Sequence, residues 1–196
     1  MNKISKKYEL WLGVAALAGC TSVADMVGYD TAALNEGAER NYTQVVQKAR
    51  SQNALDVSSP TAQRVHRVFF RLVPYANRAN RTGMPFNWQM NVIRSNDLNA
   101  WAMPGGKMAV YTGMVERLQL TDDEIAAVIG HEMTHALLEH SKKAIGGQVL
   151  TGLGGSILAG AVGLDGNLVG VGTDLLATKP FSRHQESEAD AGGVRL

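Results

Sequence analysis

Apolar residues recur at helical spacing in two long stretches of the chain. Between Thr61 and Asn80 they are Val65, Val68, Phe69, Leu72, Val73 and Ala76. Between Thr121 and Lys143 they are Ile125, Val128, Ile129, Met133, Ala136 and Leu137. A stripe with this period buries one face of a helix and leaves the opposite face polar. The pattern therefore predicts two half-buried helices.

The second of these stretches also carries helix start and stop signals. Thr121 and Glu124 have the spacing of a capping box, and acidic residues fill the first turn, where the helix dipole favours them. Two lysines precede Gly146-Gly147, a pair that favours the end of a helix. We therefore expect one continuous helix from Thr121 to Lys143.

Period-two alternation predicts a small sheet between the two helices. Residues 85–95 alternate, with Trp88, Met90 and Val92 on one side. Residues 100–103 and 107–112 resemble two more strands, joined by Pro-Gly-Gly, and residues 41–51 fit a short helix. The predicted fold is α+β, mainly helical with a small sheet beside the second helix. A strand there either accepts an extended peptide at its edge or is an ordinary strand, and the sequence leaves both open.

The second helix contains the pentapeptide His-Glu-Met-Thr-His at residues 131–135. Positions i and i+4 share one face of a helix, so His131 and His135 direct two imidazoles at one point. Glu132 is turned away from ligation but is close enough to reach a water on the metal. This is the arrangement of zinc metalloproteases, in which the carboxylate takes a proton from that water.

A catalytic zinc site requires a third protein ligand. His140 is the nearest in sequence, but a continuous helix carries it about 140° around from His135. We therefore interpret His140 as a histidine at the exposed end of the helix.

A second acidic segment, at residues 182–193, offers a better third ligand. Glu186 and Asp190 are four residues apart, so on a helix they share a face, whereas Glu188 points elsewhere. Glu186 can then bind zinc while Asp190 accepts a hydrogen bond from the far nitrogen of a ligand histidine. The alternative is a solvated acidic helix start without a metal.

Three blocks of sequence, in order, resemble the M48 family of gluzincin metallopeptidases. They are Asn99–Met114, Glu124–His140 and Ser182–Asp190, and the resemblance spans residues 86–193. It implies a zincin-like α+β fold with zinc bound by His131, His135 and Glu186, and with Glu132 as the general base. The family's Asp falls on Asp190, and a histidine at the place of His140 is frequent in the family without being a ligand.

The resemblance also implies a function and a departure from the family. Family members continue past the second acidic helix, whereas only six residues follow Asp190, so we expect the carboxy-terminal part of the domain to be missing. The implied activity is zinc-dependent endopeptidase cleavage of misfolded or misassembled envelope proteins. The alternative is a catalytically weak zinc-binding protein with a chaperone-like role or a role in outer-membrane assembly, which would have outer-membrane assembly proteins as partners.

The amino terminus has the features of a bacterial lipoprotein signal. A lysine-rich start precedes a short apolar stretch, and Leu-Ala-Gly-Cys ends at Cys20, the only cysteine in the chain. We expect a signal peptide at 1–19, a lipid-anchored tether at 20–40 with the lipid on Cys20, and a peptidase domain at 41–196. No aspartate follows Cys20, which favours the periplasmic face of the outer membrane.

Charge and apolar content bear on the partners. Lys and Arg number 19 and Asp and Glu 18, for a net charge of +1, so there is no basic excess to bind nucleic acid. Residues 144–164 are uncharged and glycine-rich. We interpret them as a helical hairpin over the cleft, acting as a lid, rather than as a membrane helix.

Overall fold

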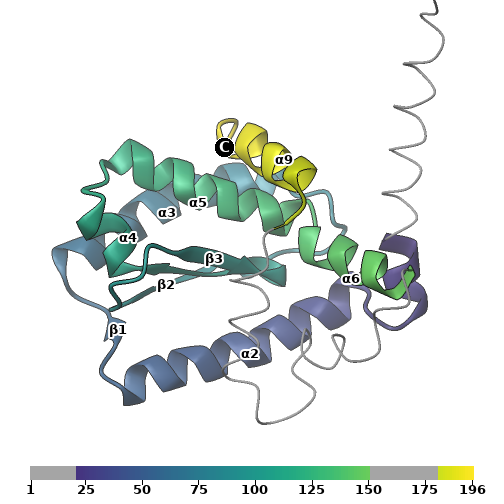
Figure 1. The fold of residues 1–196 in the computed structure, drawn as a ribbon, viewed down its shortest axis with the longest axis horizontal. Helices are drawn as coiled ribbons and strands as arrows, with labels where there is room; N and C mark the ends of the chain where they lie inside the picture. Colours follow the sequence, from purple (N-terminus) through teal and green to yellow (C-terminus); the bar gives the residue numbers. More distant parts are fainter. Residues whose placement is uncertain (1–20, 151–180) are drawn as a thin grey trace, which may run out of the picture.

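The computed structural model describes residues 21–150 and 181–196, and there the chain folds into helices packed on both faces of a small sheet (Figure 1). The first elements in chain order are α2 (Thr31–Ser51), β1 (Leu55–Asp56), α3 (Pro60–Ala79) and β2 (Gln89–Ile93). They are followed by β3 (Ala100–Met103), the 3-10 turn η1 (Pro104–Gly106), β4 (Lys107–Tyr111), α4 (Thr112–Arg117), α5 (Asp122–Leu137), α6 (His140–Leu150) and α9 (Arg183–Gly193). The predicted α+β class is confirmed.

The sheet has four strands in the order β1-β2-β4-β3. β2 and β4 run parallel, with Met90 opposite Met108, while β1 and β3 pair antiparallel with their neighbours. β2 alternates buried and half-buried positions as the sequence pattern predicts, and Met90 and Val92 face the core. β3 is an edge strand of this sheet.

A glycine turn joins β3 to β4. Gly105 and Gly106 have φ angles of 73° and 85°, which glycine adopts without steric cost. A Cβ on Gly106 would lie 2.7 Å from the ring of Trp88. The tight turn therefore requires glycine for its backbone and for the space that the indole occupies.

Two hydrophobic layers enclose the sheet. On one face, α2 contributes Tyr42, whose hydroxyl donates to the carbonyl oxygen of Met108 at 2.8 Å and whose ring meets Trp101 edge-on. On the other face, α3 and α5 share a core with β2 and β4, built on residues such as Phe69 and Ile129. Figure 1 shows the resulting order of layers, from α2 through the sheet to α3 and α5, with α9 lying outermost on α5.

Two sequence predictions differ from the structure. Residues 31–40, expected to be part of a tether, form the first half of α2 and bury Leu34 and Ala38, because that stretch has its own apolar face. The helix expected from Thr121 to Lys143 is broken, because Glu139 adopts a left-handed φ of 52° between α5 and α6. Gly146 and Gly147 lie inside α6 and do not end it.

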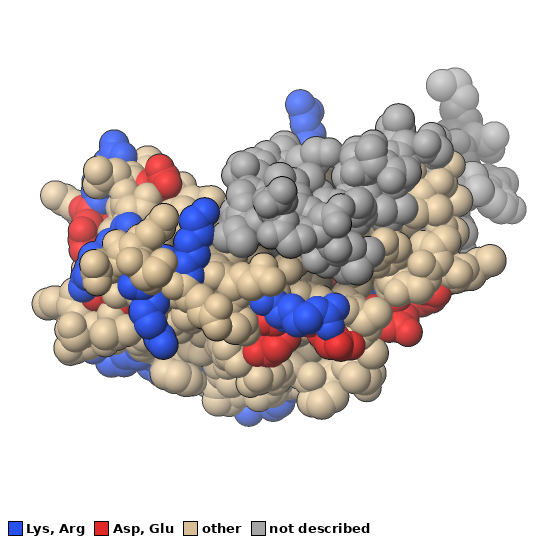
Figure 2. Space-filling model, turned by 90° about the horizontal axis from the view of Figure 1, so that it is seen from below, with Lys and Arg blue, Asp and Glu red and all other residues tan. Residues whose placement is uncertain are grey.

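The glycine-rich segment at 144–164 is described only as far as Leu150, at the end of α6. The rest of the expected lid, the signal peptide and Cys20 lie outside the described residues. Within 21–150 and 181–196, every helix is too short or too polar to cross a membrane. Seen from below, the surface carries Lys and Arg next to Asp and Glu, with uncharged residues between (Figure 2).

Candidate metal centre

The helix α5 positions both histidines of the pentapeptide. Its N-terminus is closed by the predicted capping box, in which the Thr121 N–H donates to Glu124 Oε2 at 2.8 Å and the Glu124 N–H donates to Thr121 Oγ1 at 3.3 Å. The helix then runs without interruption through His131 and His135. Their rings lie 4.7 Å apart between centroids, on one face of the helix.

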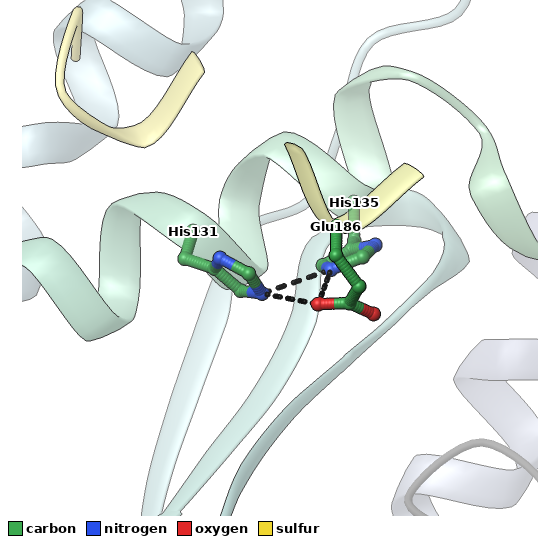
Figure 3. A group of neighbouring side chains, drawn as sticks. All are labelled: His131, His135 and Glu186. Atoms are coloured by element: carbon green, nitrogen blue, oxygen red, sulfur yellow. Dashed lines mark hydrogen bonds and ion pairs between the residues drawn. The ribbon is translucent and has the colours of Figure 1, made fainter. Parts of the chain in front are cut away.

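Glu186 of α9 joins the two histidines to form a cluster of three possible metal ligands (Figure 3). The Nε2 atoms of His131 and His135 are 3.0 Å apart. Glu186 Oε2 lies 3.4 Å from Nε2 of His131 and 3.8 Å from Nε2 of His135. The structure thus brings together residues that lie as much as 55 positions apart in sequence.

The size of the cluster fits a zinc ion. Zinc–nitrogen and zinc–oxygen bonds of roughly 2.0–2.1 Å in a tetrahedron place neighbouring ligand atoms about 3.3 Å apart. The three observed separations bracket that value, and two imidazoles with one carboxylate are a donor set used by catalytic zinc sites. Two ring nitrogens that face each other so closely beside a carboxylate also fit a shared cation.

Asp190 orients His131. Its Oδ1 lies 2.9 Å from Nδ1 of His131, so the carboxylate accepts a hydrogen bond from the Nδ1–H group. The Nε2 lone pair of His131 then faces the cluster. The position of Asp190 follows from α9, which begins with a second capping box, formed by Ser182 and Gln185. One turn of this helix separates Glu186 from Asp190.

Glycines allow α9 to lie very close to α5. A Cβ on Gly193 would lie 2.7 Å from the backbone nitrogen of His131, and a Cβ on Gly130 would lie 2.8 Å from the carbonyl oxygen of Gly193. A Cβ on Gly192 would collide with the side chain of Thr134. This contact of backbone on backbone sets the distance between the two helices and therefore the position of Glu186.

Glu132 lies beside the cluster, between α5 and the edge strand β3. Its carboxylate accepts a hydrogen bond from the backbone N–H of Ala102. Burial, and then the negative charge of Glu186, raise the pKa of Glu132 to about 8, and the Ala102 hydrogen bond opposes that shift. A divalent cation in the cluster would lower this pKa by its opposite charge.

His135 is the most enclosed member of the cluster. Its side chain is 4% exposed, and its ring stacks on Phe181 with centroids 4.2 Å apart. Burial, and then the nearby His131, lower the pKa of His135 to about 4. At neutral pH the ring is therefore uncharged, which is the form that ligates a metal.

The prediction that His140 lies at an exposed helix end is wrong. The turn at Glu139 interrupts the helix and redirects the chain, and His140 is fully buried with its Nδ1 2.8 Å from Nδ1 of His135. The angular argument assumed a continuous helix and failed because α5 ends at Leu137. His140 contacts the back of a cluster residue and is not among the three possible ligands.

Glu188 does not join the cluster, and its side chain points elsewhere, as the sequence predicts. Its Oε2 lies 3.3 Å from Nε2 of His140. No local pattern in the sequence shows which side chain it meets. Another histidine, His66 of α3, is half-buried, and its Nε2 lies 3.1 Å from the carbonyl oxygen of Met90.

A mixed sheet with an edge strand beside a His-Glu-x-x-His helix, and a glutamate supplied by a second helix, together define a zincin-like α+β protein. The profile of peptidase family M48 matches residues 59–196, and the chain belongs to that family. This confirms the resemblance found in the sequence.

Curated relatives agree with this assignment. The chain is 38% identical over 126 residues to metalloprotease LoiP of Escherichia coli, covering 61% of this chain and 48% of LoiP. It is 31% identical over 137 residues to the mitochondrial metalloendopeptidase OMA1 of Schizosaccharomyces pombe, covering 70% and 39%. It is 30% identical over 131 residues to the beta-barrel assembly-enhancing protease of Yersinia pestis, covering 60% and 26%. The chain thus spans less than half the length of each of these relatives.

Proposed function

We propose that this protein is a zinc-dependent endopeptidase whose metal is held by His131, His135 and Glu186. The observation that carries the proposal is the convergence of these three side chains from α5 and α9, with ligand atoms all within 4.8 Å of one another. The names of the relatives, metalloprotease and metalloendopeptidase, support the same class of reaction.

Zinc bound there would polarise the scissile carbonyl and lower the pKa of a water to about 7. Glu132 is the general base of the proposal, because its carboxylate lies next to the cluster without belonging to it. It takes a proton from the attacking water and passes it to the leaving amine. The Ala102 N–H steadies the carboxylate between these two transfers.

The edge strand β3 supports binding of an extended peptide. Among the described strands it pairs only with β4, and it lies next to Glu132, so a substrate strand added at its other edge would bring a peptide bond to the cluster. Main-chain hydrogen bonds of this kind do not select a sequence, which suits a substrate that is unfolded.

We extend the proposal to location and substrate. The Leu-Ala-Gly-Cys lipobox that ends at Cys20 supports a lipoprotein at the periplasmic face of the outer membrane. Similarity to a protein named beta-barrel assembly-enhancing protease supports the same location. Misfolded or misassembled envelope proteins are then the proposed substrates, and outer-membrane assembly proteins the proposed partners.

Zinc content and peptidase activity test the two halves of the proposal. Purified wild-type protein should carry one zinc per chain and cleave an unfolded casein-like substrate. The Glu132→Gln variant should keep the zinc and lose cleavage by about 10²–10⁴-fold, because an amide cannot accept the proton. The His135→Ala variant should lose the zinc.

The possible outcomes separate enzyme from binding protein. Wild-type protein that holds zinc but does not cleave would favour the zinc-binding, chaperone-like alternative. Full zinc retention by His135→Ala would overturn the ligand assignment, and cleavage by Glu132→Gln at the wild-type rate would overturn the role of Glu132.

A further inference from the structure

The two histidines of the cluster must both present Nε2 to a metal, but within residues 21–150 and 181–196 only one of them contacts a carboxylate through its Nδ1. Asp190 contacts Nδ1 of His131 directly. Behind His135, the contact to Nδ1 is another imidazole, that of His140 at 2.8 Å. Figure 3 shows this second nitrogen of His135 turned away from the cluster.

The protons of this contact can be assigned by elimination. A neutral imidazole has one N–H donor and one acceptor nitrogen. If Nε2 of His135 presents its lone pair to the cluster, Nδ1 must carry the proton and donate it to Nδ1 of His140. His140 then carries its own proton on Nε2, which requires an acceptor on the far side.

Glu188 is in the position to be that acceptor. Its Oε2 lies 3.3 Å from Nε2 of His140, and both atoms are buried without a well-formed hydrogen bond in the described part of the chain. The only other imidazole that the structure records near Glu188 Oε2 is that of the exposed His184, at 3.2 Å. At this distance Glu188 Oε2 is within reach of the proton on His140 Nε2.

The surroundings leave His140 little freedom. Its side chain is fully buried, its ring lies 5.7 Å from Phe181, and its backbone carbonyl accepts from Gln185 Nε2 at 3.3 Å. The same turn of α9 thus fixes His140 from two sides. An arrangement this enclosed is suited to hold one tautomer.

We propose that His140 and Glu188 are positioning residues that keep the proton of His135 on Nδ1 and its Nε2 lone pair directed at Glu186 and His131. The inference rests on the proposed metal site and adds a second carboxylate to it. Asp190 orients one ligand histidine directly, and Glu188 orients the other through an intervening imidazole. Helix α9 would then supply one ligand and both orienting carboxylates, at positions 186, 188 and 190.

Two substitutions of His140 test the inference in the full-length chain. His140→Leu removes both the acceptor and the donor, whereas His140→Asn keeps an amide oxygen near the place of Nδ1. Loss of an orienting partner typically weakens metal binding by about 10–100-fold. Zinc affinity, measured by competition with a chelator, should fall by that factor in His140→Leu and by less in His140→Asn, with Glu188→Gln also weakened.

A spectroscopic readout is independent of metal loading. In metal-free protein labelled with ¹⁵N-histidine, the ring nitrogens of His135 should report a proton on Nδ1, and His140→Leu should shift that balance toward Nε2. His66→Leu is the matched control, because it removes another half-buried histidine far from the cluster in sequence and should alter neither quantity.

The outcomes are distinguishable from failure of the proposed function. Wild-type protein that binds no zinc would overturn the metal site, while the tautomer in metal-free protein would still report on His140. Equal zinc affinity in wild type and His140→Leu, or an unchanged His135 tautomer, would overturn the positioning role. Equal losses in His140→Leu and His140→Asn would reduce His140 to packing.

Discussion

At the scale of single residues, the cluster places ionisable side chains where burial acts against their charged forms. His135 is held neutral by burial, and Glu132 has its pKa raised by burial and by Glu186. Both effects suit a site completed by a cation, because a positive charge reverses the cost of ionising Glu132. The folding stability of the metal-free protein should therefore depend on pH through the ionisation of these groups.

Glu132 gives a residue-scale prediction for the metal-free protein. Its pKa is about 8 in the folded state against 4.5 for the model side chain, so the unfolded state loses the proton first as pH rises. The stability that the protonated carboxyl contributes is complete below about pH 4.5 and is lost as pH rises through about 8. Metal-free Glu132→Gln should therefore gain stability relative to wild type between those values, as measured by urea unfolding.

The opposite pH dependence in that experiment would contradict the placement of Glu132. An advantage of Glu132→Gln that is the same at pH 5 and pH 8 would mean that the carboxyl ionises normally. Glu36→Gln provides the control, because that carboxylate is exposed in an ion pair with Arg40 and should leave the difference between the two pH values unchanged.

At the scale of elements, the contact between α5 and α9 determines whether the cluster exists. The approach depends on Gly130, Gly192 and Gly193, which leave no space for a Cβ. Because α9 carries Glu186 and Asp190, a small displacement of this helix separates them from both histidines. Substitution of a glycine that does not itself bind the metal should therefore alter metal binding.

Gly193→Ala tests that dependence. The new methyl group would lie 2.7 Å from the His131 backbone nitrogen, so α9 must shift, and overpacking of this kind costs about 1–3 kcal/mol. We expect a lower midpoint of thermal unfolding and weaker zinc binding. Gly147→Ala is the matched control, because it lies in α6 with no atom within 4 Å of the new Cβ and should leave zinc binding unchanged. Equal zinc affinity in both variants would refute the dependence.

At the scale of the whole molecule, a metal in the cluster would connect segments far apart in sequence. His131 and His135 belong to the central helix, whereas Glu186 belongs to the last described helix. Binding to the folded state alone contributes about 4 kcal/mol when zinc is at a thousand-fold excess over its dissociation constant. Zinc would then stabilise the fold as well as take part in the reaction.

Chelation should consequently destabilise the protein. A stability loss of that size lowers the unfolding midpoint by on the order of 10 °C for a chain of this length. Residues 181–196 should become sensitive to protease, since α9 loses its connection to α5 through the metal. Calorimetry and limited proteolysis, with and without chelator, measure the two effects. If neither changes, packing alone holds α9 in place.

The location of the molecule is a further prediction at this scale. The lipobox predicts acylation of Cys20, so a fatty-acid probe should label the wild-type protein and spare Cys20→Ser. Wild-type protein should fractionate with the outer membrane, and Cys20→Ser should not. A Cys20→Ser protein that remains in the membrane fraction would require a different anchor.

Local physics made much of this protein predictable from its sequence alone. The capping box at Thr121, the i, i+4 geometry of His131 and His135, and the alternation along β2 all depend on neighbours within a few residues. The same local rule placed Glu186 and Asp190 on one helical face. For these features the pattern and the structure agree.

Only the tertiary structure decided what lies across from each of these faces. Glu139 has a left-handed φ, and its carboxylate accepts a 2.5 Å hydrogen bond from the hydroxyl of Thr31 in α2. The residues next to Glu139 in sequence carry no signal for this turn. That turn buries His140 against His135, where a continuous helix would have exposed it. The meeting of α5 with α9, and of Glu132 with Ala102, likewise depends on contacts between residues far apart in sequence. Such contacts are decided by how whole elements pack, and periodicity within one element carries no information about its neighbour.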